Sequence, residues 1–186
     1  MPLAKEEPYY TYADYLEWDE GEHAEIVDGE IFMLGAPARI HQDVGGELFN
    51  RIKNWLSGKP CKVYSSPFSV RLSPAGDNSD DTVFEPDIAV ICDSGKLDDR
   101  GCNGAPDMVI EILSPSTARH DRLVKFRKYQ QAGVREYWIV DPDMKTAQVC
   151  ILENGWYWVT MYDDTDMVPV TVLPGCEIKL AEVFTE

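Results

Sequence analysis

The sequence predicts a mixed α/β fold in which a central mixed sheet is flanked by helices. The chain has 186 residues and 44% of them are hydrophobic, so it can bury a core of its own. Residues 107–142 form an apolar run, a helical segment and a second apolar run, which together have the length of a parallel strand–helix–strand crossover. The sequence has no internal repeat and no long linker, so we expect one domain over residues 1–186.

The N-terminal part is expected to contain two helices and a hairpin. Residues 11–18 read as a short helix with Thr11 as its N-cap. Residues 23–34 read as a β-hairpin with its turn at Asp28 and Gly29. Residues 40–58 have apolar residues at positions 40, 44, 48 and 52, which is helical spacing, and Gly58 can end this helix.

The remaining segments are expected to be strands of one sheet around one central helix. Residues 62–73 read as a strand pair or a bent strand, and a strand over 84–92 begins near Pro86. Residues 107–114 form the next strand, residues 116–133 the helix, and residues 135–142 a strand parallel to the preceding one. Residues 146–163 form a hairpin around Asn154 and Gly155, and residues 168–184 add a short strand and a terminal helical turn.

The net charge of −16 disfavours loose electrostatic binding to nucleic acid, which needs many Lys and Arg contacts. Basic residues nevertheless gather at positions 119, 122, 125, 127, 128 and 135. No apolar stretch is long enough to cross a bilayer and the first ten residues do not resemble a signal peptide, so we expect a cytoplasmic protein without a membrane partner. No CxxC spacing occurs, and we expect the five cysteines to be reduced and mostly buried: Cys61, Cys92, Cys102, Cys150 and Cys176.

Two acidic residues, Asp87 and Glu111, stand within apolar strands. Side chains alternate along a strand, so two neighbouring strands of one sheet can bring Asp87 and Glu111 together. Two such carboxylates repel each other unless a cation lies between them. Mg²⁺ and Mn²⁺ favour one or two carboxylates together with water and phosphate oxygens. The alternative is that Glu111 pairs with an arginine on a neighbouring strand or helix.

The central helix places a basic residue on its apolar side. At 100° per residue, its apolar arc runs from Ala132 to Leu123, and Lys125 lies inside this arc. An ammonium that faces the sheet needs carboxylate partners. The alternatives are that Lys125 extends along the helix edge into solvent or pairs with Asp121 one turn earlier. An Asp, a Glu and a Lys that converge suit phosphodiester hydrolysis, because the acids hold Mg²⁺ and the lysine offsets transition-state charge.

These segments resemble a known family. "FEPDIAVI" and "PDMVIEILSPSTARHDRLVKFRKYQQAGVREYWIVDP" are similar to the restriction-endonuclease family called Uma-two, within the PD-(D/E)XK nuclease superfamily. The segments "HAEIVDGEIFML", "IHQDVGGEL" and "LPGCEIKLAEVF" also resemble that family. The resemblance therefore covers nearly the whole chain and implies a restriction-endonuclease-like fold.

The resemblance also implies a catalytic set. Asp87 and Glu111 match the two acids that serve as metal ligands. In the common superfamily pattern the lysine follows the second acid by two residues, where this chain has Leu113. The family resembled here moves the lysine to the following helix, and Lys125 matches that place. The expected catalytic residues are therefore Asp87, Glu111 and Lys125.

Two further candidates lie upstream. Glu25 matches an acid that often makes an additional metal contact in this superfamily, and the alternative is an ordinary strand-surface acid. His41 can contact a phosphate or a metal-bound water, although a capping or solvated role is favoured for a histidine at the start of a helix. Trp138, Tyr137, Trp156 and Trp158 can stack on bases, but core or cross-strand positions are favoured for them.

Two main functions follow as expectations. The first is a Mg²⁺- or Mn²⁺-dependent endonuclease whose substrate is DNA. The second is a nuclease-fold protein of weak or no activity that works as a binding or assembly partner, which the net charge of −16 favours. Hydrolysis of a smaller phosphate ester is a third option. Exposed hairpin edges make a homodimer plausible.

Overall fold

The computed structural model describes residues 8–18, 23–73 and 75–185. Its helical elements are α1 (Tyr12–Tyr15), α2 (Arg39–Trp55), η1 (Ser94–Lys96), the π-helix η2 (His120–Lys125), α3 (Phe126–Ala132) and η3 (Leu180–Glu182). Its strands are β1 (Ala24–Val27), β2 (Glu30–Met33), β3 (Lys62–Ser65), β4 (Ser69–Arg71), β5 (Val83–Phe84), β6 (Ile88–Ile91), β7 (Leu97–Asp98), β8 (Gly101–Asn103), β9 (Met108–Ile112), β10 (Glu136–Asp141), β11 (Thr146–Glu153), β12 (Trp156–Asp163), β13 (Met167–Pro169) and β14 (Glu177–Lys179).

The described strands form two six-stranded sheets and one pair, instead of the single sheet expected from sequence. One sheet has the order β12-β11-β10-β9-β6-β3 and the other β2-β1-β5-β4-β8-β7, while β13 pairs with β14. The chain changes sheet between β3 and β4 and again between β5 and β6, so each predicted strand there is divided between two sheets. The mixed α/β class itself is confirmed, because β9 and β10 run parallel while β10, β11 and β12 are antiparallel.

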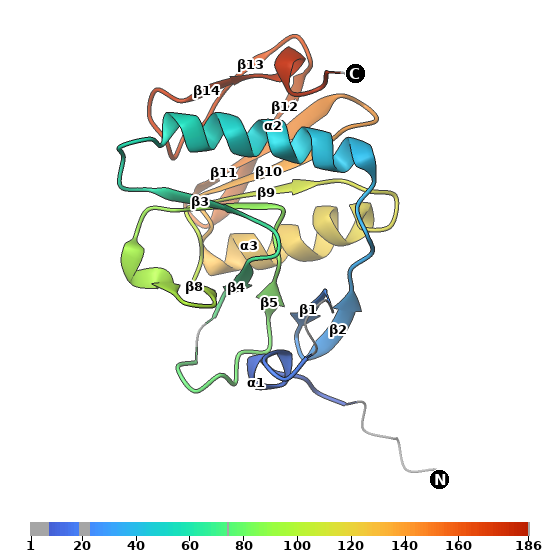
Figure 1. The fold of residues 1–186 in the computed structure, drawn as a ribbon, viewed down its shortest axis with the longest axis vertical. Helices are drawn as coiled ribbons and strands as arrows, with labels where there is room; N and C mark the ends of the chain where they lie inside the picture. Colours follow the sequence, from blue (N-terminus) through green and yellow to red (C-terminus); the bar gives the residue numbers. More distant parts are fainter. Residues whose placement is uncertain (1–7, 19–22, 74, 186) are drawn as a thin grey trace.

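Helices α2 and α3 cover opposite faces of the sheet that contains β9 (Figure 1). Val44, Leu48 and Ile52 of α2 pack in one core cluster with Ile110 and Ile112 of β9. Tyr129 of α3 belongs to a second cluster with Val109 of β9, into which the second sheet also packs. Alternation along β9 therefore directs Glu111, like Val109, toward the α3 side.

Several local predictions are confirmed by the described elements. Thr11 is the N-cap of α1, with its side chain bonded to Asp14. Asp28 and Gly29 lie between β1 and β2 with positive φ angles, and Asn154 and Gly155 do the same between β11 and β12. In the ranges that the structure covers, no helix has both the length and the apolar character that a membrane span requires.

The helix before β10 differs from its prediction because its first part is a π-helix. A π-helix has a wider turn than the 100° wheel assumes, and Leu123, expected on the apolar arc, is 48% exposed. Trp138 and Tyr137 are buried, as expected. Trp156 and Trp158 on the outermost strand β12 are exposed, so they take the cross-strand alternative, opposite Glu153 and Ile151 of β11.

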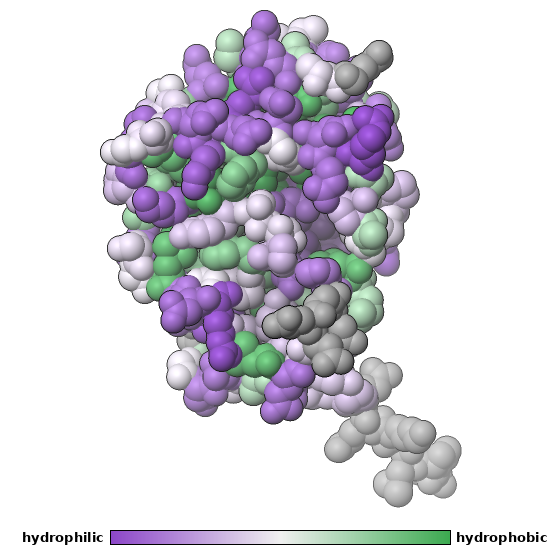
Figure 2. Space-filling model, in the orientation of Figure 1, coloured by the Kyte–Doolittle hydropathy of each residue, from purple (hydrophilic) through white to green (hydrophobic). Residues whose placement is uncertain are grey.

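The expectation of five reduced cysteines is wrong for one pair. Cys61 and Cys92 form a disulfide. They stand one position outside the β3–β6 register pair of Lys62 and Ile91, so the antiparallel pairing brings them face to face. The other three cysteines are free and buried, as expected. On the face shown in Figure 2, hydrophilic residues gather over α2 and the C-terminal segment above it.

Candidate active site

A pocket of about 920 Å³ lies between α2 and the loop that follows β9. Its wall also includes the segment before α2, the turn after β3, the entry to β6 and the start of η2. Among the described residues that line it there is one lysine and no arginine. The charged side chains of the lining are mostly acidic: Glu85, Asp87, Glu111, Asp121 and Lys125.

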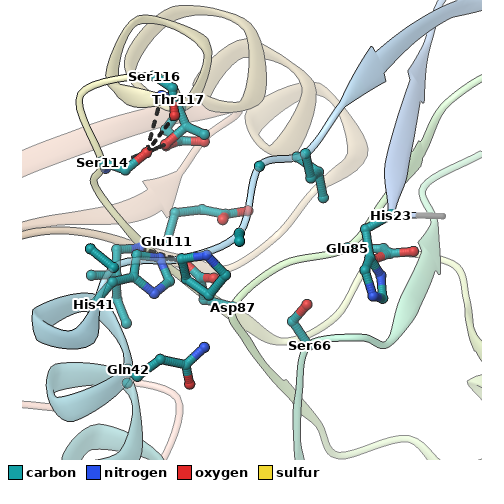
Figure 3. A pocket seen from close by; sticks show the side chains of 18 of the residues that line it. His23, His41, Gln42, Ser66, Glu85, Asp87, Glu111, Ser114, Ser116 and Thr117 are labelled. Carbon is teal, nitrogen blue, oxygen red and sulfur yellow. Dashed lines mark hydrogen bonds and ion pairs between the residues drawn. The ribbon is translucent and has the colours of Figure 1, made fainter. Parts of the chain in front are cut away.

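Asp87 and Glu111 meet because β6 and β9 are antiparallel neighbours. Asp87 stands just before β6, and extending the β6–β9 register by one residue places it opposite Glu111. Its Oδ2 accepts a hydrogen bond from the N–H of Ile112 at 2.7 Å and lies 3.2 Å from Nε2 of His41. Figure 3 shows His41, Asp87 and Glu111 gathered on one side of the pocket. The favoured role for His41 is wrong, because Ala38 is the N-cap and the His41 side chain is only 15% exposed.

Lys125 points into the protein and holds two glutamates together. Its Nζ is 2.7 Å from Oε1 of Glu25, 2.9 Å from Oε1 of Glu111 and 3.5 Å from Oδ1 of Asp121. The residue is only 3% exposed, so the alternative in which it extends into solvent is wrong. The expected helix-edge pair with Asp121 exists, but it is buried and is the longest of the three contacts. Glu111 pairs with this lysine rather than with an arginine.

The two glutamates have further partners that fix them in place. Glu25 is fully buried, so it is not a strand-surface acid. It accepts a hydrogen bond from the N–H of Glu85 at 3.0 Å, and its Oε2 lies 3.2 Å from Nε2 of His120. Tyr129 donates its hydroxyl to Oε1 of Glu111 at 2.8 Å. These contacts connect β1, β9 and the central helix through one buried polar network.

The electrostatics of the network keep Lys125 charged and shift the pKa values of Glu111 and Glu25 in opposite directions. Burial alone would lower the pKa of Lys125, but Glu111, Glu25 and Asp121 outweigh it and hold that pKa well above its usual value. Burial raises the pKa of Glu111 well above its usual value, against the effect of Lys125. Burial acts on Glu25 as well, but Lys125 and the hydrogen bond with His120 outweigh it and lower the pKa of Glu25.

His41 is held by the acid beside it. Burial lowers the pKa of His41, but the hydrogen bond and the charge of Asp87 outweigh burial and raise that pKa above its usual value. A contact with the backbone of Ile112 acts in the same direction. The imidazolium form is therefore favoured next to Asp87.

Sequence reasoning misses four residues of this site. It gives Asp121 only as a surface partner of Lys125, although its place four residues before a buried lysine is a usable signal. His23 and His120 show no pattern in sequence, yet His23 lies 3.3 Å from Oε2 of Glu85 and His120 contacts Glu25. Glu85 lines the pocket on the side opposite His41 (Figure 3).

The donor atoms of the pocket fit a divalent cation. Asp87 and Glu111 supply the hard oxygen ligands that Mg²⁺ and Mn²⁺ prefer, and the pocket holds more carboxylates than cationic groups. Within the part of the chain that the structure describes, no three His, Cys, Asp or Glu side chains already surround a metal position. Mg²⁺ often takes only one or two protein carboxylates and keeps several waters, so the two acids suffice.

The fold is a mixed α/β fold, and comparison with solved structures finds a chain of similar fold. A chain from Anabaena variabilis, described as "a putative nuclease belonging to DUF820", matches with a TM-score of 0.74 and 20% identity. The match covers 94% of this chain and 97% of that one. The chain therefore has a restriction-endonuclease-like fold.

The chain belongs to the Uma2 family, described as "Putative restriction endonuclease", whose model matches residues 12–181. The resemblance to Uma-two seen in sequence is thereby confirmed. Two proteins from Synechocystis sp., both described as uncharacterized, are similar to it. The protein slr1290 is 31% identical over 124 residues, which is 66% of this chain and 63% of that protein. The protein sll1609 is 24% identical over 136 residues, 70% of this chain and 74% of that protein.

Proposed function

We propose that this chain is a Mg²⁺- or Mn²⁺-dependent nuclease domain, spanning residues 1–186, that hydrolyses phosphodiester bonds of DNA. Asp87, Glu111 and Lys125 are its proposed catalytic residues, and Asp87 and Glu111 its proposed metal ligands. The observation that carries the proposal is the ammonium of Lys125, buried against Glu111 at the edge of a pocket that Asp87 also lines. A scaffold that only binds a partner has no need for this costly arrangement.

The described side chains can divide the work as follows. When bound, Mg²⁺ or Mn²⁺ polarises the phosphate and lowers the pKa of a coordinated water. Asp87 and Glu111 hold the cation from neighbouring strands. Lys125 stays protonated, so it acts by offsetting the negative charge of the transition state rather than by accepting a proton. Glu25 forms a second ion pair with Lys125, and His41 contacts Asp87.

The pocket also bears on the kind of substrate. Its volume of about 920 Å³ is within the range of small-ligand sites. Because its lining carries one lysine and no arginine among the described residues, a phosphate must be attracted mainly by the bound cation. Membership of a restriction-endonuclease family favours DNA as the substrate. The size of the pocket favours a small phosphate ester as the second candidate.

A cleavage assay tests the proposal. Wild-type protein is incubated with Mn²⁺ and double-stranded DNA, single-stranded DNA, RNA or bis(p-nitrophenyl) phosphate. Glu111→Gln keeps the shape of the side chain and is expected to lower DNA cleavage by about 100-fold or more. Glu153→Gln, at an exposed position of β11, is the matched control and should cleave like wild type. If only the small ester is hydrolysed, the substrate is a small phosphate ester rather than DNA. Equal cleavage rates for Glu111→Gln and wild type would refute the proposed catalytic site.

We also propose that two copies of the chain associate through β12. This strand ends its sheet and pairs only with β11 among the described strands. Trp156, Trp158 and Met161 are 70%, 67% and 57% exposed. No charged residue lies between Trp156 and Tyr162, in a chain whose net charge is −16. An uncharged apolar edge strand is a template for antiparallel pairing with its own copy.

Light scattering coupled to size-exclusion chromatography tests this association. Wild type is expected at twice the chain mass of 21.1 kDa. Trp158→Lys should shift the protein to the monomer mass, whereas Met144→Lys, which also changes an exposed apolar residue but lies off the strand, should not. A monomeric wild type would refute the dimer and would leave the nuclease proposal unchanged.

A further inference from the structure

Asp121 stands out among the buried carboxylates of this protein. It lies in η2, is 1% exposed and lines the same pocket as Asp87 and Glu111. Neither Oδ1 nor Oδ2 has a hydrogen-bond partner in the described structure. The nearest opposite charge is Nζ of Lys125, which is 3.5 Å from Oδ1.

Two buried glutamates of the same fold, in contrast, have hydrogen-bond partners for their carboxylates. Glu25 accepts a hydrogen bond from the N–H of Glu85, forms an ion pair with Lys125 and contacts His120. Glu136 accepts from Nε1 of Trp138 at 2.7 Å and from a backbone N–H at 2.8 Å. Buried polar groups nearly always have such partners, because leaving them without partners is costly. The hydrogen-bonding capacity of the Asp121 carboxylate is therefore unfilled in the described structure, apart from its 3.5 Å ion-pair contact with Lys125.

Lys125 cannot fill this role, because it is already shared. Its ammonium is closer to Glu25 and to Glu111, at 2.7 and 2.9 Å, than to Asp121. One positive charge thus faces three carboxylates, and Asp87 adds a fourth at the pocket wall. These carboxylates repel one another when they are ionised, and a bound cation would relieve that repulsion.

The backbone holds Asp121 in this position. Its carbonyl oxygen accepts hydrogen bonds from the N–H of Phe126, which closes the π-helical turn, and from the hydroxyl of Tyr137 on β10. π-Helical turns are frequent at functional sites. These two bonds fix the backbone of Asp121, whose side chain lines the pocket.

We propose that Asp121 is a further cation-binding residue of this pocket, which holds a divalent metal ion beside Glu111 directly or through one bound water. The proposal rests on the metal-dependent function proposed above and adds a residue to it. An aspartate offers two hard oxygens, which suit Mg²⁺ and Mn²⁺ and the water molecules they retain. The unfilled hydrogen-bonding capacity of Asp121 is then satisfied by the ion or its water.

Calorimetric titration of the nucleic-acid-free protein with Mn²⁺ tests this role. Asp121→Asn keeps the size of the side chain and removes its charge. We expect it to weaken Mn²⁺ binding by about 10- to 100-fold, as is typical when a carboxylate that positions a metal site is removed. Asp143→Asn, at an exposed position outside the pocket, is the matched control and should bind like wild type. Thermal unfolding without metal should show Asp121→Asn to be at least as stable as wild type, so weaker binding will not be due to unfolding.

A double variant separates metal binding from a purely structural role. If Asp121 acts only by positioning Lys125, then Asp121→Asn will not weaken Mn²⁺ binding further in a Lys125→Met background. We expect additional weakening there. The inference is overturned by equal Mn²⁺ affinity of Asp121→Asn and wild type, by loss of the effect in the double variant, or by a wild type that binds no Mn²⁺. Mn²⁺ binding without DNA cleavage would instead refute the proposed function and leave the role of Asp121 standing.

Discussion

Replacing Lys125 by methionine removes the positive charge that lies between Glu25 and Glu111. The lysine is 3% exposed, and its Nζ is 2.7 Å and 2.9 Å from the two carboxylates. Methionine retains most of the apolar stem, so the change reports mainly on charge. Removing one partner of a buried ion pair typically costs about 3–5 kcal/mol, because the other charge is left without compensation. We therefore expect the free energy of unfolding at pH 7 to fall by about 3–5 kcal/mol.

Chemical denaturation followed by tryptophan fluorescence measures this loss. Lys128→Met is the control, because Lys128 lies on the same helix but pairs with the exposed Asp28. Such a surface pair is worth about 0–1 kcal/mol. The deficit of Lys125→Met should shrink toward pH 4, because burial raises the pKa of Glu25 once Lys125 is gone and protonation then removes its uncompensated charge. If Lys125→Met does not fold, the double variant Glu25→Gln with Lys125→Met should recover stability.

If Lys125→Met and Lys128→Met lose the same small free energy of unfolding, below about 1 kcal/mol, then Lys125 does not bear a buried charge. A loss that is independent of pH between 4 and 7 would show that packing, rather than charge, explains the effect.

Three further predictions concern the same pocket. The raised pKa of Glu111 favours its neutral form, so its contribution to stability is full at low pH and is lost as the pH rises through that pKa. The free energy of unfolding of Glu111→Gln should therefore rise relative to that of wild type between pH 5 and pH 8. A difference between the two proteins that does not change with pH would contradict this. Asp87 raises the pKa of His41, so an NMR titration should show a lower His41 pKa in Asp87→Asn than in wild type. An unchanged His41 pKa would contradict the contact between the two side chains. Gly46 lies inside α2 with open space where an alanine methyl group would stand, whereas a methyl group on Gly45 would meet a core side chain. In thermal unfolding, Gly46→Ala should stabilise the protein by about 0.5–1 kcal/mol and Gly45→Ala by less. Equal gains would contradict the packing of α2.

Much of the fold could be predicted because its local signals agree with its tertiary structure. The Asp28-Gly29 and Asn154-Gly155 turns lie where positive φ angles are needed. The crossover from β9 to β10 is parallel because its length and handedness allow little else. The division into two six-stranded sheets could not be predicted, because short strands such as β5 carry no signal for the sheet they join.

The site was only partly predictable for similar reasons. Lys125 could be placed because a lysine on an apolar helix face needs buried acids. The prediction that Leu123 faces the core is wrong because it assumes α-helical spacing of 100° per residue, whereas this segment is a π-helix. The disulfide between Cys61 and Cys92 depends on a strand register that sequence spacing does not reveal. The free oxygens of Asp121 could not be foreseen, because an aspartate four residues before a lysine normally indicates a surface pair.

The most direct measurement is the initial rate of DNA cleavage with Mn²⁺, compared between wild type and Glu111→Gln. We expect wild type to cleave DNA only with the divalent cation present, to stop when the cation is chelated, and to be about 100-fold or more faster than Glu111→Gln. Intact DNA after incubation with a Mn²⁺-bound wild type, or equal rates for the two proteins, would contradict the claim that this pocket is a nuclease site.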